Sequence, residues 1–203
     1  MNWFPEKFEE CELDTVILVA GMPGAGKSIV SEAARTLGLR IVRMGDIIRE
    51  IAAENSKPPS DEVLGYISQK IRELHGRDIV ARAALHIACS EEHGGPVLVE
   101  GVRSPEEVEY FRRHSRSCLT IAVHSPPNVR YQRLLARGRK DDPKSWEEFK
   151  TRDERELSLG LGSVIALADI ILVNHEKRPE DLFVEAKSIL EKVIGVYSSD
   201  ARG

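Results

Sequence analysis

Five short apolar segments recur along the chain, and each has the length of a β-strand. Residues 15–20 form a continuous run of apolar and β-branched side chains that leads into a glycine, which is the pattern of a parallel strand buried on both faces. The same pattern predicts four further strands, at residues 39–44, 97–99, 118–123 and 169–173. Because helical segments separate these strands, we expect an α/β domain with a parallel sheet.

Helix signals fill the intervals between the predicted strands. Asp46 is suited to cap a helix that begins at Ile47, and Ser104 followed by Pro105 and two glutamates is a strong helix start. Residues 145–157 are highly charged and are expected to form an exposed helix. Further helices are expected at residues 27–37, 61–73, 78–93, 125–137 and 179–196. Breaks or turns are expected at residues 55–60, 94–96 and 138–144, and a frayed tail at 198–203.

The length of 203 residues suits one domain with a core of its own, and no internal repeat or long linker divides the chain. We therefore expect a single domain over residues 1–203, with an acidic N-terminal extension at 1–14 that carries Trp3 and Phe4. The extension lacks the basic start and long apolar stretch of a signal peptide, and the longest apolar run is too short to cross a bilayer. These features predict a cytoplasmic protein without a membrane segment.

Three cysteines, Cys11, Cys89 and Cys118, are widely spaced along the chain. An odd and scattered set argues against a disulfide framework. Cys89 and Cys118 stand in apolar stretches, where a cysteine behaves as a small buried hydrophobe. No pair or cluster of cysteines and histidines has the spacing of a metal site, and we assign no role to the six histidines.

The net charge of −4 argues against a general nucleic-acid-binding protein, which usually carries a basic excess. The charge is nevertheless uneven. Between residues 130 and 140 the chain has five basic residues and no acidic one, namely Arg130, Arg133, Arg137, Arg139 and Lys140. Such a run is either an ordinary exposed helix face or part of a site for an anion.

Residues 21–28 read Gly-Met-Pro-Gly-Ala-Gly-Lys-Ser, directly after the first predicted strand and at the start of a helix. They match the phosphate-binding loop G-x-x-x-x-G-K-[ST] at every fixed position and in the required context. Glycines let backbone N–H groups turn toward phosphates, and the helix dipole attracts the anion. Lys27 is expected to reach the β- and γ-phosphates of ATP, and the Ser28 hydroxyl to ligate Mg²⁺. The predicted nucleotide-binding residues are Gly21, Met22, Pro23, Gly24, Ala25, Gly26, Lys27 and Ser28.

Hydrolases, switches and kinases all use such a loop, and a kinase also needs a second anion site that faces it. Arginine suits that site because its planar fork pairs with phosphate oxygens. Two candidate elements follow the second and third predicted strands, Met44-Gly45-Asp46-Ile47-Ile48-Arg49 and Glu100-Gly101-Val102-Arg103. Further candidates are the arginine-rich segment 133–142 and, on the helix after it, Arg152 and Arg155. Together with segment 168–174, they resemble elements of adenylate kinases and of the related nucleoside monophosphate and dephospho-coenzyme A kinases. The resemblance extends to an archaeal group related to adenylate kinase and covers roughly residues 16–193.

The resemblance implies a three-layer P-loop NTPase fold whose five-stranded parallel sheet has the order 2-3-1-4-5. It also implies a helical acceptor arm near residues 50–77 and a short lid near 137–147. ATP and Mg²⁺ are the implied cofactors, with Ser28 and Glu100 as metal ligands. Glu100 stands where the related kinases have aspartate, and the element before Arg103 is one residue shorter than theirs.

The resemblance also implies a division of roles among the polar residues. The acceptor would be held by Asp46, Arg49, Arg103 and Arg152, with Arg155 as an alternative to Arg152. Three lid arginines would close over the transferring phosphoryl group. The implied catalytic residues are Lys27, Asp46, Arg133, Arg137 and Arg139.

Three functions are compatible with these features. The first is a phosphotransferase that acts on a small phosphorylated acceptor, a nucleoside monophosphate. The second is a dephospho-coenzyme A kinase, in which Asp46 acts as general base toward a ribose hydroxyl. The third is an ATP-dependent switch or accessory factor with a protein or RNA partner, which would not require an arginine lid. Simpler roles also remain open: a helix cap for Asp46, a solvated position for Arg49, and pairing of Arg155 with Glu154 or Glu156.

Overall fold

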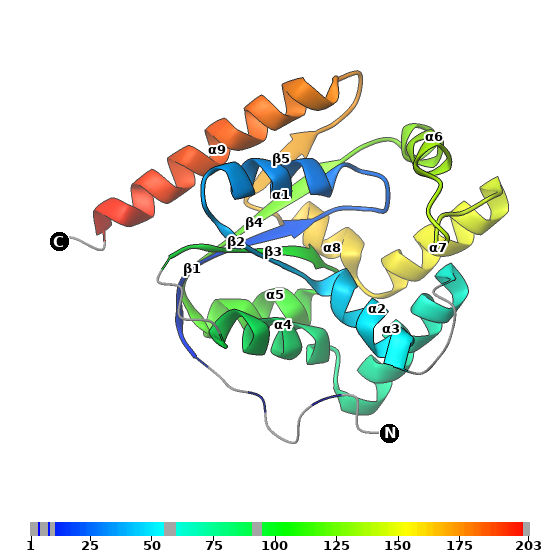
Figure 1. Cartoon of the computed structure of the whole chain (residues 1–203), viewed down its shortest axis with the longest axis horizontal. Coiled ribbons are helices and arrows are strands. Elements are labelled where there is room, and N and C mark those ends of the chain that lie inside the picture. Colours follow the sequence, from blue (N-terminus) through cyan, green and yellow to red (C-terminus); the bar gives the residue numbers. More distant parts are fainter. Residues whose placement is uncertain (1–3, 5–7, 9–10, 55–59, 91–94, 201–203) are drawn as a thin grey trace.

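The computed structural model describes residues 4, 8, 11–54, 60–90 and 95–200, and within them the chain folds around one parallel β-sheet (Figure 1). The strands are β1 (Leu13–Ala20), β2 (Arg40–Arg43), β3 (Val97–Val102), β4 (Ser115–His124) and β5 (Ile170–Val173). They lie in the order β2-β3-β1-β4-β5, and every neighbouring pair is parallel. The five predicted strands and their predicted order are therefore confirmed.

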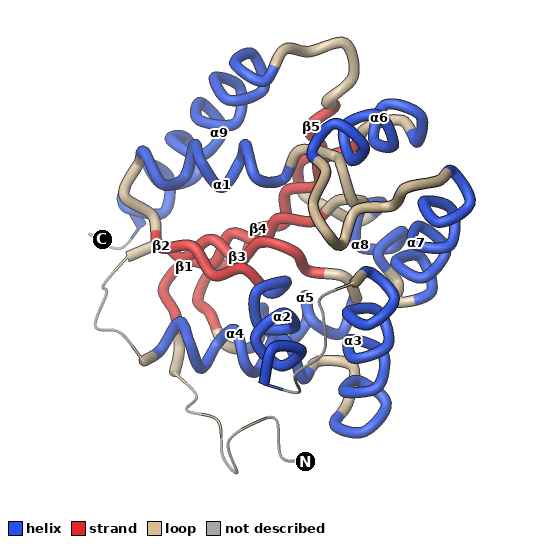
Figure 2. Tube along the Cα trace, turned by 45° about the vertical axis from the view of Figure 1, so that its right-hand side comes forward, coloured by secondary structure: helices blue, strands red, loops and turns tan. Residues whose placement is uncertain are grey.

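Helices connect the strands and surround the sheet, as Figure 2 shows. They are α1 (Lys27–Thr36), α2 (Met44–Glu54), α3 (Asp61–His75), α4 (Ile79–Cys89), α5 (Pro105–Arg113), α6 (Pro127–Arg137), α7 (Trp146–Ser158), α8 (Leu161–Ala166) and α9 (Pro179–Asp200). The helices α1 and α9 cover one face of the sheet, and α4 and α5 cover the other. The expected three-layer α/β architecture is confirmed.

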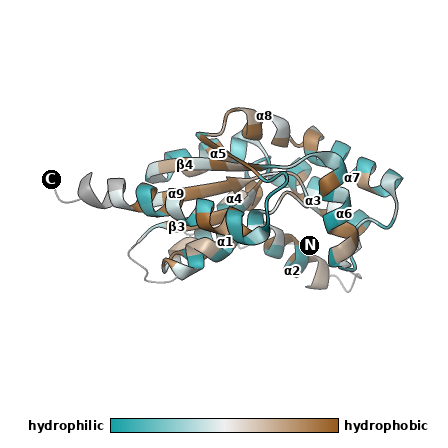
Figure 3. Cartoon of the chain, turned by 90° about the horizontal axis from the view of Figure 1, so that it is seen from above, coloured by the Kyte–Doolittle hydropathy of each residue, from teal (hydrophilic) through white to brown (hydrophobic). Residues whose placement is uncertain are grey.

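The central strand β1 shows why helices pack on both faces of the sheet. Its side chains alternate between two apolar clusters. Val16 and Leu18 join the cluster that contains α4 and α5, while Ile17 and Val19 join the cluster that contains α1 and α9. All four side chains are fully buried, as the continuous apolar run predicted. In Figure 3 the strands are coloured mainly as hydrophobic, whereas the helices around them mix hydrophilic and hydrophobic residues.

The start of α5 follows the predicted capping pattern and also ties α3 to the core. The Ser104 hydroxyl accepts a hydrogen bond from the Glu107 backbone N–H, and the Glu107 carboxylate accepts one from the Ser104 backbone N–H, each at 3.3 Å. Glu107 is fully buried and forms an ion pair with Arg72 of α3, with a distance of 2.6 Å. Helix α3, which lies within the segment expected to form the acceptor arm, is therefore attached to α5 by a buried charge pair.

Several expected boundaries differ from the structure. Strand β2 runs directly into α2, which begins at Met44, so Asp46 lies in the first turn of the helix and is not its cap. Helix α4 ends at Cys89, with Ser90 as its C-cap, earlier than the predicted end at 93. Helix α8 was not predicted, because its six residues are too few to display a helical period.

The ends of the chain and the breaks are only partly described. Helix α9 continues to Asp200, so the expected frayed tail is wrong for residues 198–200. The remaining predictions for Trp3, for the break at 55–59 and for residues 201–203 lie outside the described residues. Within the described part of the chain, no helix combines the length and the apolar character needed to cross a membrane.

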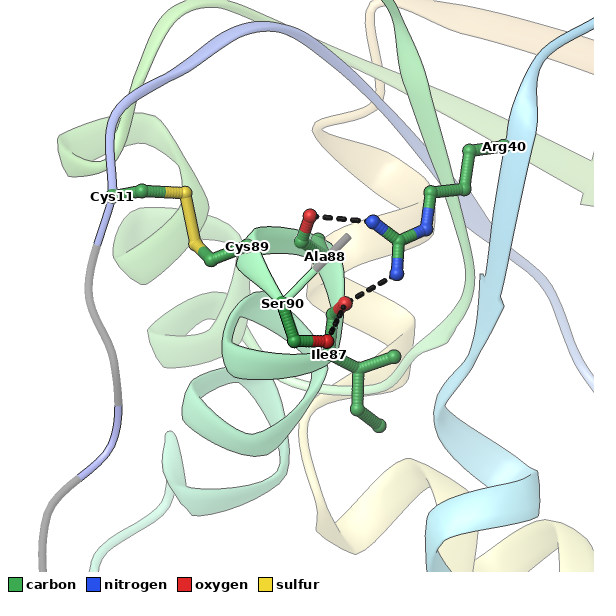
Figure 4. The surroundings of a disulfide bond; sticks show 6 residues. All are labelled: Cys11, Arg40, Ile87, Ala88, Cys89 and Ser90. Carbon is green, nitrogen blue, oxygen red and sulfur yellow. Dashed lines mark hydrogen bonds between the residues drawn. A yellow bond between two sulfur atoms is a disulfide. The ribbon is translucent and has the colours of Figure 1, made fainter. Parts of the chain in front are cut away.

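Cys11 and Cys89 form a disulfide bond across 78 positions of sequence, so the expected absence of disulfides is wrong (Figure 4). The segment before β1 passes the C-terminal end of α4, where Phe8 contacts the edge of His86. On the other side of this helix end, Arg40 of β2 donates hydrogen bonds to two carbonyls of α4. The cysteine pairing arises from this tertiary packing, which spacing along the chain does not reveal. Cys118 is a free thiol.

We predict that reduction of the Cys11–Cys89 disulfide lowers the free energy of unfolding by about 4 kcal/mol, because the crosslink restricts a long loop of the unfolded chain. Denaturant unfolding with and without a dithiol measures the difference. Cys118→Ser is the matched control and should keep the full difference, whereas Cys89→Ser should remove it. Equal stability of the oxidised and reduced protein would contradict the prediction.

Candidate active site

The phosphate-binding loop joins the carboxyl end of β1 to the N-terminus of α1. Gly24 and Gly26 have φ angles of 80° and 109°, which L side chains rarely adopt. A Cβ atom at Gly26 would collide with the side-chain nitrogen of Asn174, and this nitrogen donates a 2.7 Å hydrogen bond to the Ala25 carbonyl. The loop is therefore held from the β5 side, and the N-terminus of α1 faces the cavity that the loop lines.

Lys27 lies at the base of this loop. Its Nζ donates a 2.6 Å hydrogen bond to the carbonyl of Gly21. Burial lowers the pKa of Lys27 to about 8, although the carboxylates of Glu100 and Glu156 act in the opposite direction. The ammonium group would be stabilised further by an approaching phosphate, because a nearby opposite charge favours the charged form.

A cavity of about 580 Å³ opens above the loop, and a smaller cavity of about 120 Å³ shares part of its wall. The larger one is lined by the predicted residues Lys27, Ser28, Asp46, Arg49, Glu100, Arg133, Arg137 and Arg139. The smaller one adds Arg103 and Arg152. The structure thus brings all predicted catalytic, acceptor and metal residues to one edge of the sheet, where the parallel strands end. Two of the predicted nucleotide-binding residues do not line these two cavities: Ala25 is fully buried, and Met22 packs against the core.

The smaller cavity is strongly basic, although the chain has a net charge of −4. Seven basic side chains and three acidic ones line it. The basic residues are Lys27, Arg43, Arg49, Arg103, Arg137, Arg139 and Arg152, and the acidic residues are Glu100, Asp141 and Glu156. A concentration of positive charge in one cavity of an acidic protein favours anionic ligands.

Glu100 and Ser28 are the residues available to a metal ion. The Glu100 carboxylate accepts a 2.6 Å hydrogen bond from the Ser31 hydroxyl and lies 3.3 Å from the Arg43 Nε. The described residues contain no cluster of three histidine, cysteine or acidic side chains that could hold a metal. One carboxylate and one hydroxyl fit Mg²⁺ that is bound together with phosphate oxygens, which is how Mg²⁺ usually binds at nucleotide sites.

Two predicted acceptor arginines are paired with carboxylates. Arg49 Nη2 lies 2.7 Å from Asp46 on the same helix turn. Arg103 Nη1 lies 3.1 Å from Oε1 of Glu156, whose side chain is almost completely buried. The predicted exposed helix at 145–157 is therefore wrong on the face that carries Glu156.

Two arginines of α7 pair with the first turn of α3. Arg152 Nε lies 3.1 Å from a carboxylate oxygen of Asp61 in the first turn of α3, and Arg155 pairs with the other oxygen. The carboxylate partner of Arg155 is therefore Asp61, and not Glu154 or Glu156 as in the alternative that the sequence left open. Asp61 connects α3 to α7 by two ion pairs.

The segment between α6 and α7 forms the turn expected for the lid. Asp142 is buried and accepts hydrogen bonds of 2.9 Å from the Arg137 Nε and from the backbone N–H of Arg139. Burial alone would raise the pKa of Asp142, but these hydrogen bonds and the Arg137 charge outweigh it, so the pKa is lowered. An ionised aspartate thus fixes the segment after α6 to the end of this helix.

The basic run on α6 is not a plain exposed helix face. Arg130 is only 3% exposed, and its Nη1 donates a 2.8 Å hydrogen bond to Asp153 of α7. Arg133 donates hydrogen bonds of 3.1 Å to the Ser125 hydroxyl and to the side-chain oxygen of Asn174. Of these two cavities Arg133 lines only the larger one, whereas Arg137 and Arg139 line both.

Sequence reasoning gave no site role to Glu156, Asp61 or Asn174. Glu156 stands four residues after Arg152, a spacing that places both on one helix face and could have indicated a shared site. Asn174 follows the end of a predicted strand, which is the usual place for site residues in such sheets. Asp61 gave no local signal, because its partner Arg155 lies 94 positions away.

Comparison with known proteins supports the same fold. An AAA domain model matches residues 17–156. A UPF0200 protein of Hyperthermus butylicus is 45% identical over 180 residues, covering 89% of this chain and 95% of the relative. A UPF0200 protein of Pyrococcus abyssi is 46% identical over 182 residues, covering 88% and 95%.

Two solved kinases illustrate the structural likeness. The shikimate kinase of Aquifex aeolicus gives a TM-score of 0.52 at 20% identity, over 87% of this chain and 96% of the kinase. A gluconokinase of Sinorhizobium meliloti gives a TM-score of 0.52 at 15% identity, over 93% and 98%. The chain therefore has the fold of small P-loop kinases, as expected.

We predict that the protein takes up a proton when it binds ATP at about pH 9, and that this proton uptake is small at about pH 7. The pKa of Lys27 is about 8 before binding, and phosphate charge raises it, so the lysine regains its proton in the complex. ATP affinity should accordingly fall as the pH rises through 8. Titration calorimetry without added metal, in buffers of different ionisation enthalpy, measures the uptake. Lys27→Arg stays charged and is the control; proton uptake as large in this variant would contradict the prediction.

Proposed function

The chain belongs to the UPF0200 family and carries an AAA domain, and we propose that it transfers the γ-phosphoryl group of ATP to a small phosphorylated acceptor, a nucleoside monophosphate. The main observation in support of this proposal is that seven basic side chains line the smaller cavity beside the phosphate-binding loop. A switch requires one anion site, whereas these cations extend from the loop to α2, α7 and the segment after β3. Such an arrangement suits two anionic groups that must be brought together.

On the donor side, the loop backbone and Lys27 would hold the β- and γ-phosphates. Ser28 and Glu100 would hold Mg²⁺, which neutralises phosphate charge when it is bound. Asn174 keeps the loop in place through its hydrogen bond to the Ala25 carbonyl. Because Arg133 bonds to Asn174 and lines only the larger cavity, we assign it to the donor nucleotide.

On the acceptor side, Arg49, Arg103 and Arg152 would hold the acceptor phosphate. These arginines are paired with carboxylates, so an incoming phosphate replaces or shares existing contacts. Arg137 and Arg139 line both cavities and would face the transferring group from the lid. Arginines placed on developing phosphate charge contribute about 10³–10⁵ in rate in related reactions.

A hydroxyl acceptor is a second candidate, and the position of Asp46 favours it. The Asp46 side chain is 48% exposed and lines the same cavity as Lys27 and Glu100. A carboxylate there could accept a hydroxyl proton as general base, which an acceptor phosphate does not need. The two kinases of similar fold are named for shikimate and gluconate, which carry hydroxyl groups, and dephospho-coenzyme A offers a ribose hydroxyl.

We predict that one nucleoside monophosphate accelerates ADP release from Mg-ATP by about tenfold or more, because a bound acceptor replaces water as the receiving group. A coupled assay with AMP, CMP, UMP, GMP and dephospho-coenzyme A measures this. Lys27→Ala should abolish transfer while circular dichroism shows an intact fold. Acceleration by dephospho-coenzyme A alone would favour the second candidate, and Asp46→Asn should then lower kcat. Slow ADP release that no acceptor changes would contradict the proposal.

We predict that Arg103→Ala raises the KM for the acceptor by about tenfold or more and changes the KM for ATP by less than about twofold. The reason is that Arg103 lines the smaller cavity and lies outside the phosphate-binding loop. Steady-state kinetics with each substrate varied measure the two constants. Arg112→Ala, an exposed arginine of α5, is the matched control. Equal increases in both constants would remove the assigned role.

A further inference from the structure

Glu156 is a charged residue of α7 that the proposed roles leave unused. Its side chain is only 5% exposed and lines the smaller cavity. Its neighbour Glu154 on the same helix is exposed. A carboxylate that loses its water is costly unless charged partners surround it, so the burial of Glu156 calls for a specific set of contacts.

Arg103 forms an ion pair with this carboxylate, and three further cations act on it electrostatically. Burial alone would raise the pKa of Glu156, but Arg103, Arg152, Lys27 and Arg155 outweigh it, so the pKa is lowered and the group remains ionised. Arg103 follows β3, Lys27 begins α1, and the other two arginines share α7 with Glu156. The carboxylate therefore interacts electrostatically with both the donor lysine and the predicted acceptor arginines.

Arg103 depends on Glu156 more than the other cations do. Arg152 and Arg155 have a second carboxylate partner in Asp61. The guanidinium of Arg103 has its ion pair with Glu156, and no second carboxylate pairs with it in the described part of the chain. Its backbone N–H is held separately, by a 2.7 Å hydrogen bond to the buried carboxylate of Glu107. The main chain at Arg103 is thus fixed by one glutamate, and the direction of its side chain by another.

We propose that Glu156 is a positioning residue, which holds the Arg103 guanidinium ready for the anionic group of the acceptor. The Arg103–Glu156 ion pair is observed whatever the function of the protein, and only the identity of the anion rests on the proposed function. Arg103 can offer five N–H donors, and a contact through Nη1 leaves others for a phosphate. With Glu156 ionised, neighbouring cations can remain close together before the acceptor arrives. Removal of the negative charge would release the Arg103 side chain and weaken the acceptor site, while the phosphate-binding loop stays intact.

The kinetic test compares three single variants with the unmodified protein. Glu156→Gln should raise the acceptor KM by about tenfold and change the KM for ATP by less than about twofold, the size expected for one charged hydrogen bond. Glu156→Asp should recover part of the loss, and Glu154→Gln should have no effect. In the Arg103→Ala background, Glu156→Gln should add less than about twofold, because its effect passes through Arg103. Full additivity, or equal losses for both substrates with a large fall in melting temperature, would overturn the proposal.

A second test does not depend on activity. In ¹⁵N-labelled protein, the Nη–H signal of Arg103, whose Nη1 forms the ion pair, can be assigned by its loss in Arg103→Lys. We expect a sharp signal with slow solvent exchange in the unmodified protein and in Glu154→Gln, and a broadened or exchanged signal in Glu156→Gln. An unchanged signal in Glu156→Gln would overturn the positioning role. If no acceptor supports transfer by the unmodified protein, the proposed function fails, and this spectrum still decides the role of Glu156.

Discussion

Repulsion between cations at the carboxyl edge of the sheet is the constraint on which the rest of the site depends. Lys27, Arg103 and Arg152 come from separate elements and line one small cavity. Like charges in a partly buried cavity repel one another more strongly than in water. Buried or half-buried carboxylates reduce this repulsion. The main ones are Glu156 and Asp61, which pair with the arginines and so hold the cations close together. An anionic ligand meets a site whose positive groups are already in place.

The sheet and the phosphate-binding loop could be predicted because their signals are local. The apolar run at 15–20 is buried on both faces, and the glycine pattern at 21–28 lies between a strand and a helix, as the sequence indicates. The helix boundaries that were predicted wrongly depend on tertiary structure. Helix α2 starts at Met44 because β2 enters it without a loop, and α8 is stabilised by burying Leu161 and Val164 rather than by its own length.

Arg49 and Arg103 could be predicted because they follow strands whose ends meet at one edge of a parallel sheet, whereas the arginines of α6, α7 and the segment between them were predicted from the family resemblance. Their partners were not, since contacts between distant segments leave no trace in local sequence. Asp61 lies 94 positions from Arg155, and Cys11 lies 78 positions from Cys89. Glu156 had the charge pattern of an exposed helix, but its burial is decided by the packing of α7 beside Arg103. Composition and periodicity describe which residues can be charged, whereas packing decides which charges meet.

The proposed kinase activity requires that the γ-phosphoryl group of ATP is transferred to the acceptor and not to water. ³¹P NMR of a reaction with Mg-ATP and the acceptor that most accelerates ADP release observes the destination of this group directly. The account predicts that the γ-phosphoryl signal is replaced by a new phosphate signal on the acceptor, with little inorganic phosphate formed. Conversion of ATP only to ADP and inorganic phosphate, at the same rate with and without the acceptor, would contradict it.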